Sequence, residues 1–249
     1  MNQENMNAFG VLLALAAAAP ALCEKPTTPN VRGHQLTITE RNVLIAHGDR
    51  LEKPGKEILT LTGVLDEYNG GGQKVSSAVT IRWEFPDKLT VSNATRNEQV
   101  QFNGSDVSKP GGNISEKDQD IVESMVHDTT DSFILGRFAG SSISSIGHGF
   151  NLQDPRSTNK LTGVCDLFQV AEEGGVRGKT SKTDKVYCFD PSTHYLKAVI
   201  YKDGGVLLET RASGWRLVSG NALPSVIQRY RNNALSLSLN ITNAVFTGR

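Results

Sequence analysis

Apolar and polar residues alternate along much of the chain, and this period of two is typical of half-buried β-strands. The clearest run is SAVTIRWEF at residues 77–85, whose apolar face consists of Val79, Ile81, Trp83 and Phe85. LTLTGVL at 59–65 alternates leucines with threonines, and YNGGGQ at 68–73 carries glycines that permit the positive φ of a tight turn. The two runs therefore predict an antiparallel hairpin with one apolar face.

Shorter runs with the same alternation predict further strands, namely KLTVSN at 88–93, EQVQF at 98–102 and LSLSLNIT at 235–242. We expect NGSDVSKPGGN at 103–113 to form a loop, and SSISSIGHGFNL at 141–152 to form a loop of mixed apolar character. No internal repeat or low-complexity linker interrupts residues 35–249, which favours a single domain after a flexible linker at 24–34.

Residues 115–140 follow a different period. In SEKDQDIVESMVHDTTDSFILGRFAG the apolar residues stand at helical spacing, at 121, 122, 125, 126, 133, 134 and 138. Ser115 can cap the helix, and Glu116 and Asp118 suit the positive end of its dipole. The TTD sequence at 129–131 predicts a break into two helices, the second of which carries an apolar stripe of Phe133, Ile134 and Phe138.

These patterns predict a mainly β fold (α+β), a curved antiparallel sheet or incomplete β-barrel with a helical lid inserted around residues 115–140. A concave apolar sheet face is unfavourable to expose, at ~25 cal/mol per Å², so we expect the lid to cover it. The predicted ligand-binding residues belong to the sheet face and the lid stripe, and they are Val79, Ile81, Trp83, Phe85, Phe133, Ile134 and Phe138.

Composition and motifs argue against several classes of function. Lys plus Arg and Asp plus Glu are balanced at 26 each, so no charge surplus points to nucleic acid. No two of the five histidines lie within four residues, and neither a CxxC nor a GxSxG motif occurs. EGGVRGKT at 173–180 lacks the first glycine of a phosphate-binding P-loop. We expect no metal, no cofactor and no enzymatic activity, with a triad assembled from distant residues as the alternative.

The first segment of the sequence predicts export. Residues 11–19, VLLALAAAA, have the length of a signal-peptide core, and the small residues at 19–21 offer a cleavage site. The absence of Lys and Arg before this run leaves a buried N-terminal helix as the alternative. We therefore predict a signal peptide at 1–23 and a soluble exported protein. Leu22 directly before Cys23 argues against a lipid anchor at that cysteine.

Cys165 and Cys188 are the even pair left in the mature chain, and both lie in strand-like segments. If these segments form a hairpin that turns near residues 176 and 177, the two cysteines face each other and can form a disulfide. Two reduced core cysteines are the alternative. The loop between them carries basic residues that predict either a solvated hairpin tip or a contact with anionic headgroups or an acidic partner, namely Arg177, Lys179, Lys182 and Lys185.

FDPSTHYL at 189–196 predicts a tight turn, in which Asp190 and His194 are turn residues rather than an acid–base pair. This segment, LETRASGWRLV at 208–218 and SGNALPSVIQRY at 219–230 resemble the closing half of the bacterial periplasmic lipoprotein-carrier (LolA-like) superfamily. LTGVL…IRWEFPDKLTV resembles the early strands of that superfamily. The lid sequence does not align with that of the carrier, so the carrier's lid-locking arginine has no assigned counterpart.

The resemblance implies an incomplete antiparallel β-barrel with helices as a lid over an apolar cavity, in a bacterial periplasmic protein. Members carry lipoproteins, bind other lipids or sense envelope stress. The predicted function is therefore a binding protein that holds a lipid or lipoprotein acyl chain. The alternative is a protein-binding envelope regulator or assembly factor with a packed cavity. A void of several hundred Å³ under the helices favours the first, and a packed interior favours the second.

We predict that the protein is cleaved between residues 19 and 24 during export, because small residues follow the apolar run there. The intact mass of the protein isolated from its own host checks this expectation. A full-length chain that begins at Met1 and stays in the cytosol contradicts it.

Overall fold

The computed structural model describes residues 57–84, 88–103, 106–130, 142–151, 164–172, 183–193, 195–219 and 221–248, and every structural statement below concerns these residues. The strands are β1 (Glu57–Tyr68), β2 (Lys74–Glu84), β3 (Lys88–Asn93), β4 (Glu98–Asn103), β5 (Asp106–Ser108), β6 (Ser142–Asn151), β7 (Val164–Glu172), β8 (Thr183–Phe189), β9 (Leu196–Asp203), β10 (Val206–Ser213), β11 (Arg216–Val218), β12 (Asn221–Leu223), β13 (Val226–Arg231) and β14 (Ala234–Gly248). The helical segments are α2 (Glu116–Val122) and the π-helix η1 (Glu123–Thr130).

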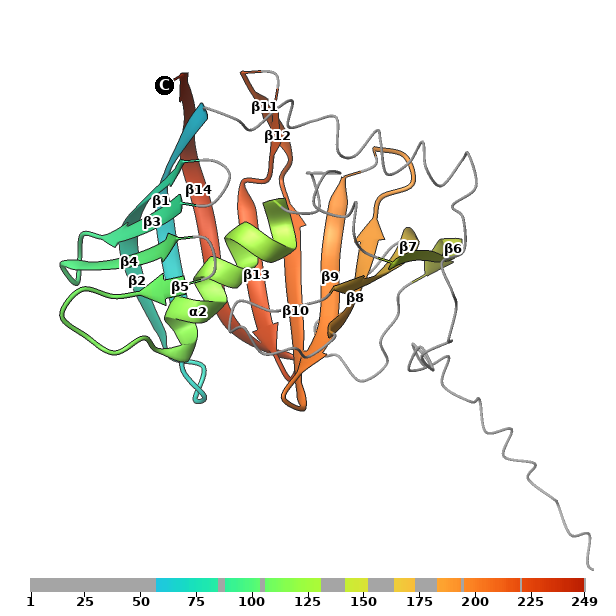
Figure 1. Ribbon diagram of the computed structural model, residues 1–249, viewed down its shortest axis with the longest axis horizontal. Helices are drawn as coiled ribbons and strands as arrows, with labels where there is room; N and C mark the ends of the chain where they lie inside the picture. Colours follow the sequence, from blue (N-terminus) through green and yellow to red (C-terminus); the bar gives the residue numbers. More distant parts are fainter. Residues whose placement is uncertain are drawn as a thin grey trace, which may run out of the picture.

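Twelve of these strands form one sheet in the order β5-β4-β3-β2-β1-β14-β13-β10-β9-β8-β7-β6, while β11 and β12 pair separately. All pairings within this sheet are antiparallel. Most strands pair with a neighbour along the chain, and β14 returns to pair with β1. Figure 1 shows the sheet as a curved surface, with α2 and η1 lying across one face. The predicted fold class, an open curved sheet with a helical cover, is confirmed.

The predicted hairpin is present as β1 and β2, with Leu61 opposite Ile81. Gly72 in the connecting turn has a φ of 76°, which glycine adopts without strain. On its other side β1 pairs with β14, and the register shifts next to Gly63. A Cβ at Gly63 would lie 2.2 Å from the backbone oxygen of Asn240, so only glycine fits this irregularity in the middle of the sheet.

Two segments that were predicted as loops contain strands. The prediction for 141–152 is wrong, because β6 pairs with β7 along most of that segment. The register between them shifts on both sides of Gly147, so the simple alternation that identifies a strand is interrupted. The loop predicted at 103–113 contains β5, a three-residue edge strand that is too short for a period to be visible.

Ser115 caps the helix, as the sequence predicted. Its hydroxyl oxygen accepts a hydrogen bond from the Asp118 N–H at 3.1 Å, and the Asp118 carboxylate accepts one from the Ser115 N–H at 2.9 Å. α2 continues into η1, which ends at Thr130, within the break predicted at 129–131. The predicted second helix, at 131–140, lies outside the described residues.

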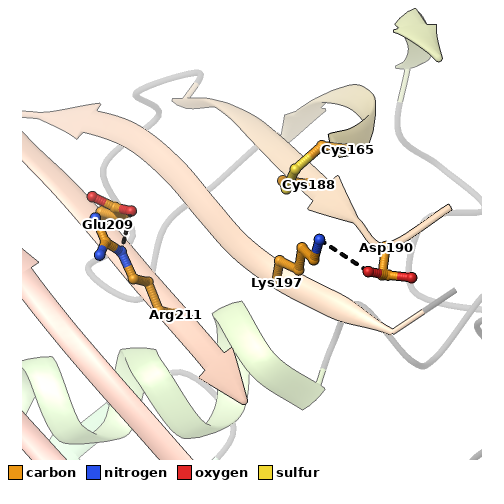
Figure 2. Close-up of a disulfide and its surroundings, with 6 residues drawn as sticks. All are labelled: Cys165, Cys188, Asp190, Lys197, Glu209 and Arg211. Atoms are coloured by element: carbon orange, nitrogen blue, oxygen red, sulfur yellow. Dashed lines mark hydrogen bonds and ion pairs between the residues drawn. A yellow bond between two sulfur atoms is a disulfide. The ribbon is translucent and has the colours of Figure 1, made fainter. Parts of the chain in front are cut away.

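The predicted disulfide joins Cys165 of β7 to Cys188 of β8, with a Cα–Cα distance of 5.3 Å (Figure 2). The predicted register was wrong by two residues, because Cys188 lies opposite Leu167. A shift of two keeps both cysteines on the same face of the sheet, so they still meet, as diagonal neighbours. Because side chains alternate along a strand, the disulfide lies on one face of the sheet and the Tyr187 side chain on the other.

We predict that replacing Cys165 and Cys188 together by alanine lowers the free energy of unfolding by about 3 kcal/mol, because the bond closes a loop of 23 residues in the unfolded chain. Urea unfolding of oxidised wild-type and double-mutant protein measures the difference. A reducing agent should weaken the wild type and leave the double mutant unchanged. Equal stability of both oxidised proteins contradicts the prediction.

Candidate functional site

The apolar face predicted from residues 77–85 lies beneath the helix. Val79, Ile81 and Trp83 of β2 are all buried. They belong to one apolar cluster that also contains helical side chains, namely Ile121, Val122 and Met125. The helix therefore covers this face of the sheet. The other predicted ligand-binding residues lie outside the described part of the chain, namely Phe85, Phe133, Ile134 and Phe138.

Little empty space separates the helix from the sheet. A cavity of about 20 Å³, which is room for roughly one water-sized group, lies between them. Its lining is almost entirely apolar and consists of Leu59, Leu61, Trp83, Met125, Thr129, Leu223, Pro224, Ile227 and Ile241. Among the described residues, the helix and this face of the sheet are thus in close contact at this pocket.

A fully buried carboxylate, Asp128 of η1, joins the helix to three strands of the sheet. Lys185 of β8 donates to Oδ1 at 3.0 Å, and Arg229 of β13 donates from Nη1 to Oδ2 at 2.5 Å. The hydroxyl of Thr210 on β10 also donates to Oδ2, at 2.6 Å. A buried carboxylate needs such partners, because an isolated charge in the interior is strongly unfavourable.

Arg229 lies at the centre of these contacts and is only 1% exposed. Besides Asp128, its guanidinium donates to the Tyr201 hydroxyl of β9 at 2.7 Å and to the Thr210 hydroxyl at 2.7 Å. Its Nε lies 3.4 Å from Asp120 of α2. The Tyr201 ring also faces the cations, with its centroid 5.2 Å from the Arg229 guanidinium carbon. Every edge of the guanidinium therefore has a partner.

The second helical carboxylate, Asp120, extends the contact towards β14. Arg231 of β13 donates to Asp120 Oδ1 at 2.9 Å, and Ser236 of β14 donates to Oδ2 at 3.3 Å. Together with Asp128, Lys185 and Arg229, these side chains attach both ends of the helix to the sheet. We call the five charged residues the helix–sheet ion network, which consists of Asp120, Asp128, Lys185, Arg229 and Arg231.

Neighbouring charges determine whether the buried side chains of Asp128 and Tyr201 are ionised. Burial by itself raises the pKa of a carboxyl group, but Lys185 and Arg229 hold the pKa of Asp128 below its usual value. Burial and the negative charge of Asp128 raise the pKa of Tyr201. At neutral pH Asp128 is therefore ionised, and Tyr201 is a neutral phenol that accepts from Arg229.

This network was not predicted from the sequence. Lys185 was predicted to lie on an exposed basic tip, and this is wrong, because Lys185 is 4% exposed and bonded to Asp128. Two patterns could have revealed the network. Lys185 alternates in phase with the buried Tyr187, and Asp128 follows Met125 by about one turn on the apolar side of the helix. The rest of the predicted tip, at 177–182, lies outside the described residues.

Asp190 is a turn residue, as predicted. Its Oδ1 accepts hydrogen bonds from the backbone N–H groups of Ser192 and Thr193, each at 3.0 Å. Its Oδ2 lies 2.9 Å from the Lys197 ammonium (Figure 2). Partial burial alone would raise the pKa of Asp190, but the hydrogen bonds from Lys197, Thr193 and Ser192 lower it. His194 lies outside the described residues.

Within the described ranges, no group of three or more His, Cys, Asp or Glu side chains is arranged to hold a metal ion. In the same part of the chain, no helix is long and apolar enough to cross a membrane.

Comparisons with known proteins identify the fold. Neither a family model nor a curated protein matches the chain. A domain of Vibrio parahaemolyticus that is described as that of an outer membrane lipoprotein-sorting protein superposes with a TM-score of 0.55 at 10% identity, over 83% of this chain and 91% of that one. A LolA superfamily protein of Nitrosomonas europaea gives a TM-score of 0.52 at 10% identity, over 82% and 91%.

A third solved structure, a DUF1329 family protein of Desulfovibrio piger, gives a TM-score of 0.51 at 12% identity, over 82% of this chain and 90% of that one. The resemblance to LolA-like proteins is therefore confirmed at the level of the fold. At such low identity the likeness concerns the fold alone.

We predict that Asp128→Asn lowers the free energy of unfolding by about 3–5 kcal/mol, because it leaves Lys185 and Arg229 buried without a full counter-charge. Urea unfolding followed by circular dichroism measures the change. Arg82→Gln is the control, because it breaks the exposed pair between Arg82 and Glu84 and should cost less than about 1 kcal/mol. An Asp128→Asn protein as stable as the control contradicts the structural role of the network.

Proposed function

We propose that the protein is an exported, non-enzymatic binding protein that holds an apolar ligand, a lipid or lipoprotein acyl chain. The ligand would lie between the sheet and the segment α2–η1, against Val79, Ile81 and Trp83. The observation that carries this proposal is that a helix covers an apolar sheet face while buried ion pairs hold it in place. From the sequence we include further lining residues in the proposal, namely Phe85, Phe133, Ile134 and Phe138.

Both kinds of contact can be replaced by others when the helix moves. When it leaves the sheet, the apolar side chains of Ile121, Val122 and Met125 lose their partners, but an acyl chain can replace them on the sheet face. The charged groups of the helix–sheet ion network regain water, which returns a desolvation penalty of several kcal/mol per ion. This regained hydration offsets part of the attraction that is lost between the ions, so displacing the helix costs less than the number of broken ion pairs alone suggests.

Export to the bacterial periplasm is part of the proposal. The disulfide between Cys165 and Cys188 supports it, because such bonds persist in oxidising compartments and are rare in the cytosol. The fold supports the ligand class, since one solved structure of this fold is named for lipoprotein sorting. The mature protein would be one domain at 35–249, and its basic residues at 177–182 would allow contact with a membrane surface.

A second candidate function is supported by the small cavity. About 20 Å³ is far below the several hundred Å³ of a ready-made lipid site, as expected if the cavity stays packed and the fold serves to bind another protein. In that case the protein would be an envelope regulator or assembly factor. The two functions differ in whether an acyl chain reaches the inner sheet face.

Trp83 provides a direct test, because it lies on that face and the chain holds only one other tryptophan, Trp215. We predict that a dibrominated stearic acid, a contact quencher, removes most of the Trp83 fluorescence in a delipidated Trp215→Phe variant. Unbrominated stearic acid should bind equally well without this quenching.

The matched control is the Trp83→Phe variant, in which only Trp215 emits. Its fluorescence should change little, because Trp215 packs against a second apolar cluster, which includes Leu196 and Tyr201, and not against the cluster that contains Trp83. Unquenched Trp83 in a folded, delipidated protein contradicts the lipid-binding proposal and leaves the protein-binding alternative.

A further inference from the structure

A second pocket of about 20 Å³ lies between the first turn of α2 and the strands β1, β3 and β4. Part of its lining belongs to the same apolar cluster as Trp83, namely Leu65, Val91, Val100 and Ile121. The rest is polar and consists of Glu67, Asn93, Arg96, Glu98, Lys117 and Asp118. This polar pocket therefore adjoins the apolar surface on which the proposed ligand would lie.

Asn93 brings an unused hydrogen-bond donor to the polar pocket. The residue is 6% exposed, and its Oδ1 accepts hydrogen bonds from the backbone N–H groups of Thr95 and Arg96, each at 3.1 Å. These two bonds fix the orientation of the amide, so Nδ2 is the donor left over. Among the described residues Nδ2 has no hydrogen-bond partner, and a buried donor in that state calls for one from outside the chain.

Glu67 brings the matching acceptor. Its Oε2 lies 2.7 Å from Arg96 Nη2, so its charge is compensated, but the geometry gives this oxygen no hydrogen bond. Ser77 follows the same pattern. It is the inward-facing residue of β2 next to Val79, which lies opposite Asn93, and its hydroxyl is buried without a partner in the described part of the chain. A donor, an acceptor and a hydroxyl that lack hydrogen-bond partners thus occur on three adjacent strands.

The charges around the polar pocket are balanced. Glu98 and Asp118 are both contacted by Lys109, at 3.1 and 3.5 Å, Glu67 is paired with Arg96, and Lys117 in the lining is the third cation for these three carboxylates. An added anion would be repelled by the Glu67 carboxylate oxygen, and an added cation would face the Asn93 N–H, which is a donor and cannot bind it. A neutral group that both accepts and donates is the one that suits these two atoms.

We propose that the polar pocket binds the hydroxyl group of a neutral lipid of the monoacylglycerol class. The hydroxyl would accept from Asn93 Nδ2 and donate to Glu67 Oε2. This inference rests on the proposed function, because the acyl chain of that lipid would lie on the apolar inner face. The volume of about 20 Å³ suits a hydroxyl and is too small for a carboxylate or a phosphate. A water molecule has the same hydrogen-bonding chemistry, and the experiment separates these two occupants.

The test compares three lipids that share one acyl chain. Delipidated full-chain protein is titrated by calorimetry with monooleoylglycerol, methyl oleate and oleate. We expect monooleoylglycerol to bind about tenfold more tightly than methyl oleate, the effect of about one net hydrogen bond. Oleate should bind no more tightly than methyl oleate, because its carboxylate faces Glu67.

Two variants locate the preference. Asn93→Asp keeps the oxygen that accepts from Thr95 and Arg96 and replaces the donor Nδ2 by an acceptor. Asn103→Asp makes the same change at an exposed position of β4. The tenfold preference should vanish in Asn93→Asp and persist in Asn103→Asp, while methyl oleate binds both variants like wild type and thereby reports an intact fold.

The wild-type comparison is decisive by itself. Equal affinity for the three lipids means that the pocket holds water only, which overturns this proposal and leaves the proposed function standing. A preference for oleate overturns the neutral-hydroxyl assignment in the same way. If none of the three lipids binds, both this proposal and the lipid-binding function fail.

Discussion

The buried carboxylate of Asp128 is the constraint on which the relation between helix and sheet depends. It can be ionised in the interior only because Lys185, Thr210 and Arg229 donate to it from three different strands. Those donors come together because the sheet places β8, β9, β10 and β13 side by side. The position of η1 over the sheet is therefore determined by hydrogen-bond geometry as well as by apolar contact.

The inner face of the sheet consequently has two parts with different chemistry. Over β1 to β4 and β14 it is apolar, and α2 covers it with Ile121 and Val122. Over β8 to β10 and β13 it carries the helix–sheet ion network. One helical segment spans both parts (Figure 1). In the proposed function, an acyl chain replaces the helix on the apolar part and water replaces it on the ionic part.

Elements that have a clear short-range sequence pattern were predicted correctly. The hairpin of β1 and β2 followed from alternation and a glycine turn, and the helix start followed from Ser115. Strand β6 was missed because irregular register next to Gly147 hides its period. The disulfide was predicted from the even pair of cysteines and from a hairpin register that was wrong by two residues.

The candidate site was predicted only in its apolar part. Alternation within β2 placed Trp83 on the inner face, but no local pattern tells which cation meets which carboxylate across 101 residues of chain, the separation of Asp128 and Arg229. Lys185 was assigned to an exposed basic loop because it is charged, although its alternation with Tyr187 places it on a buried face of the strand. Only the strand order brings these groups together, and strand order is a property of the whole chain.

The central claim is that the helical segment from Asp120 to Thr130 leaves the sheet when an acyl ligand binds, while the first turn of α2 and the sheet keep their structure. Hydrogen–deuterium exchange measures this directly on the delipidated protein with and without a saturating acyl lipid. The account predicts faster exchange of backbone amides in Asp120 to Thr130 on binding, with unchanged exchange in β1, β2, β13 and β14. Unchanged or slower exchange in the helix, with the lipid demonstrably bound, would contradict it.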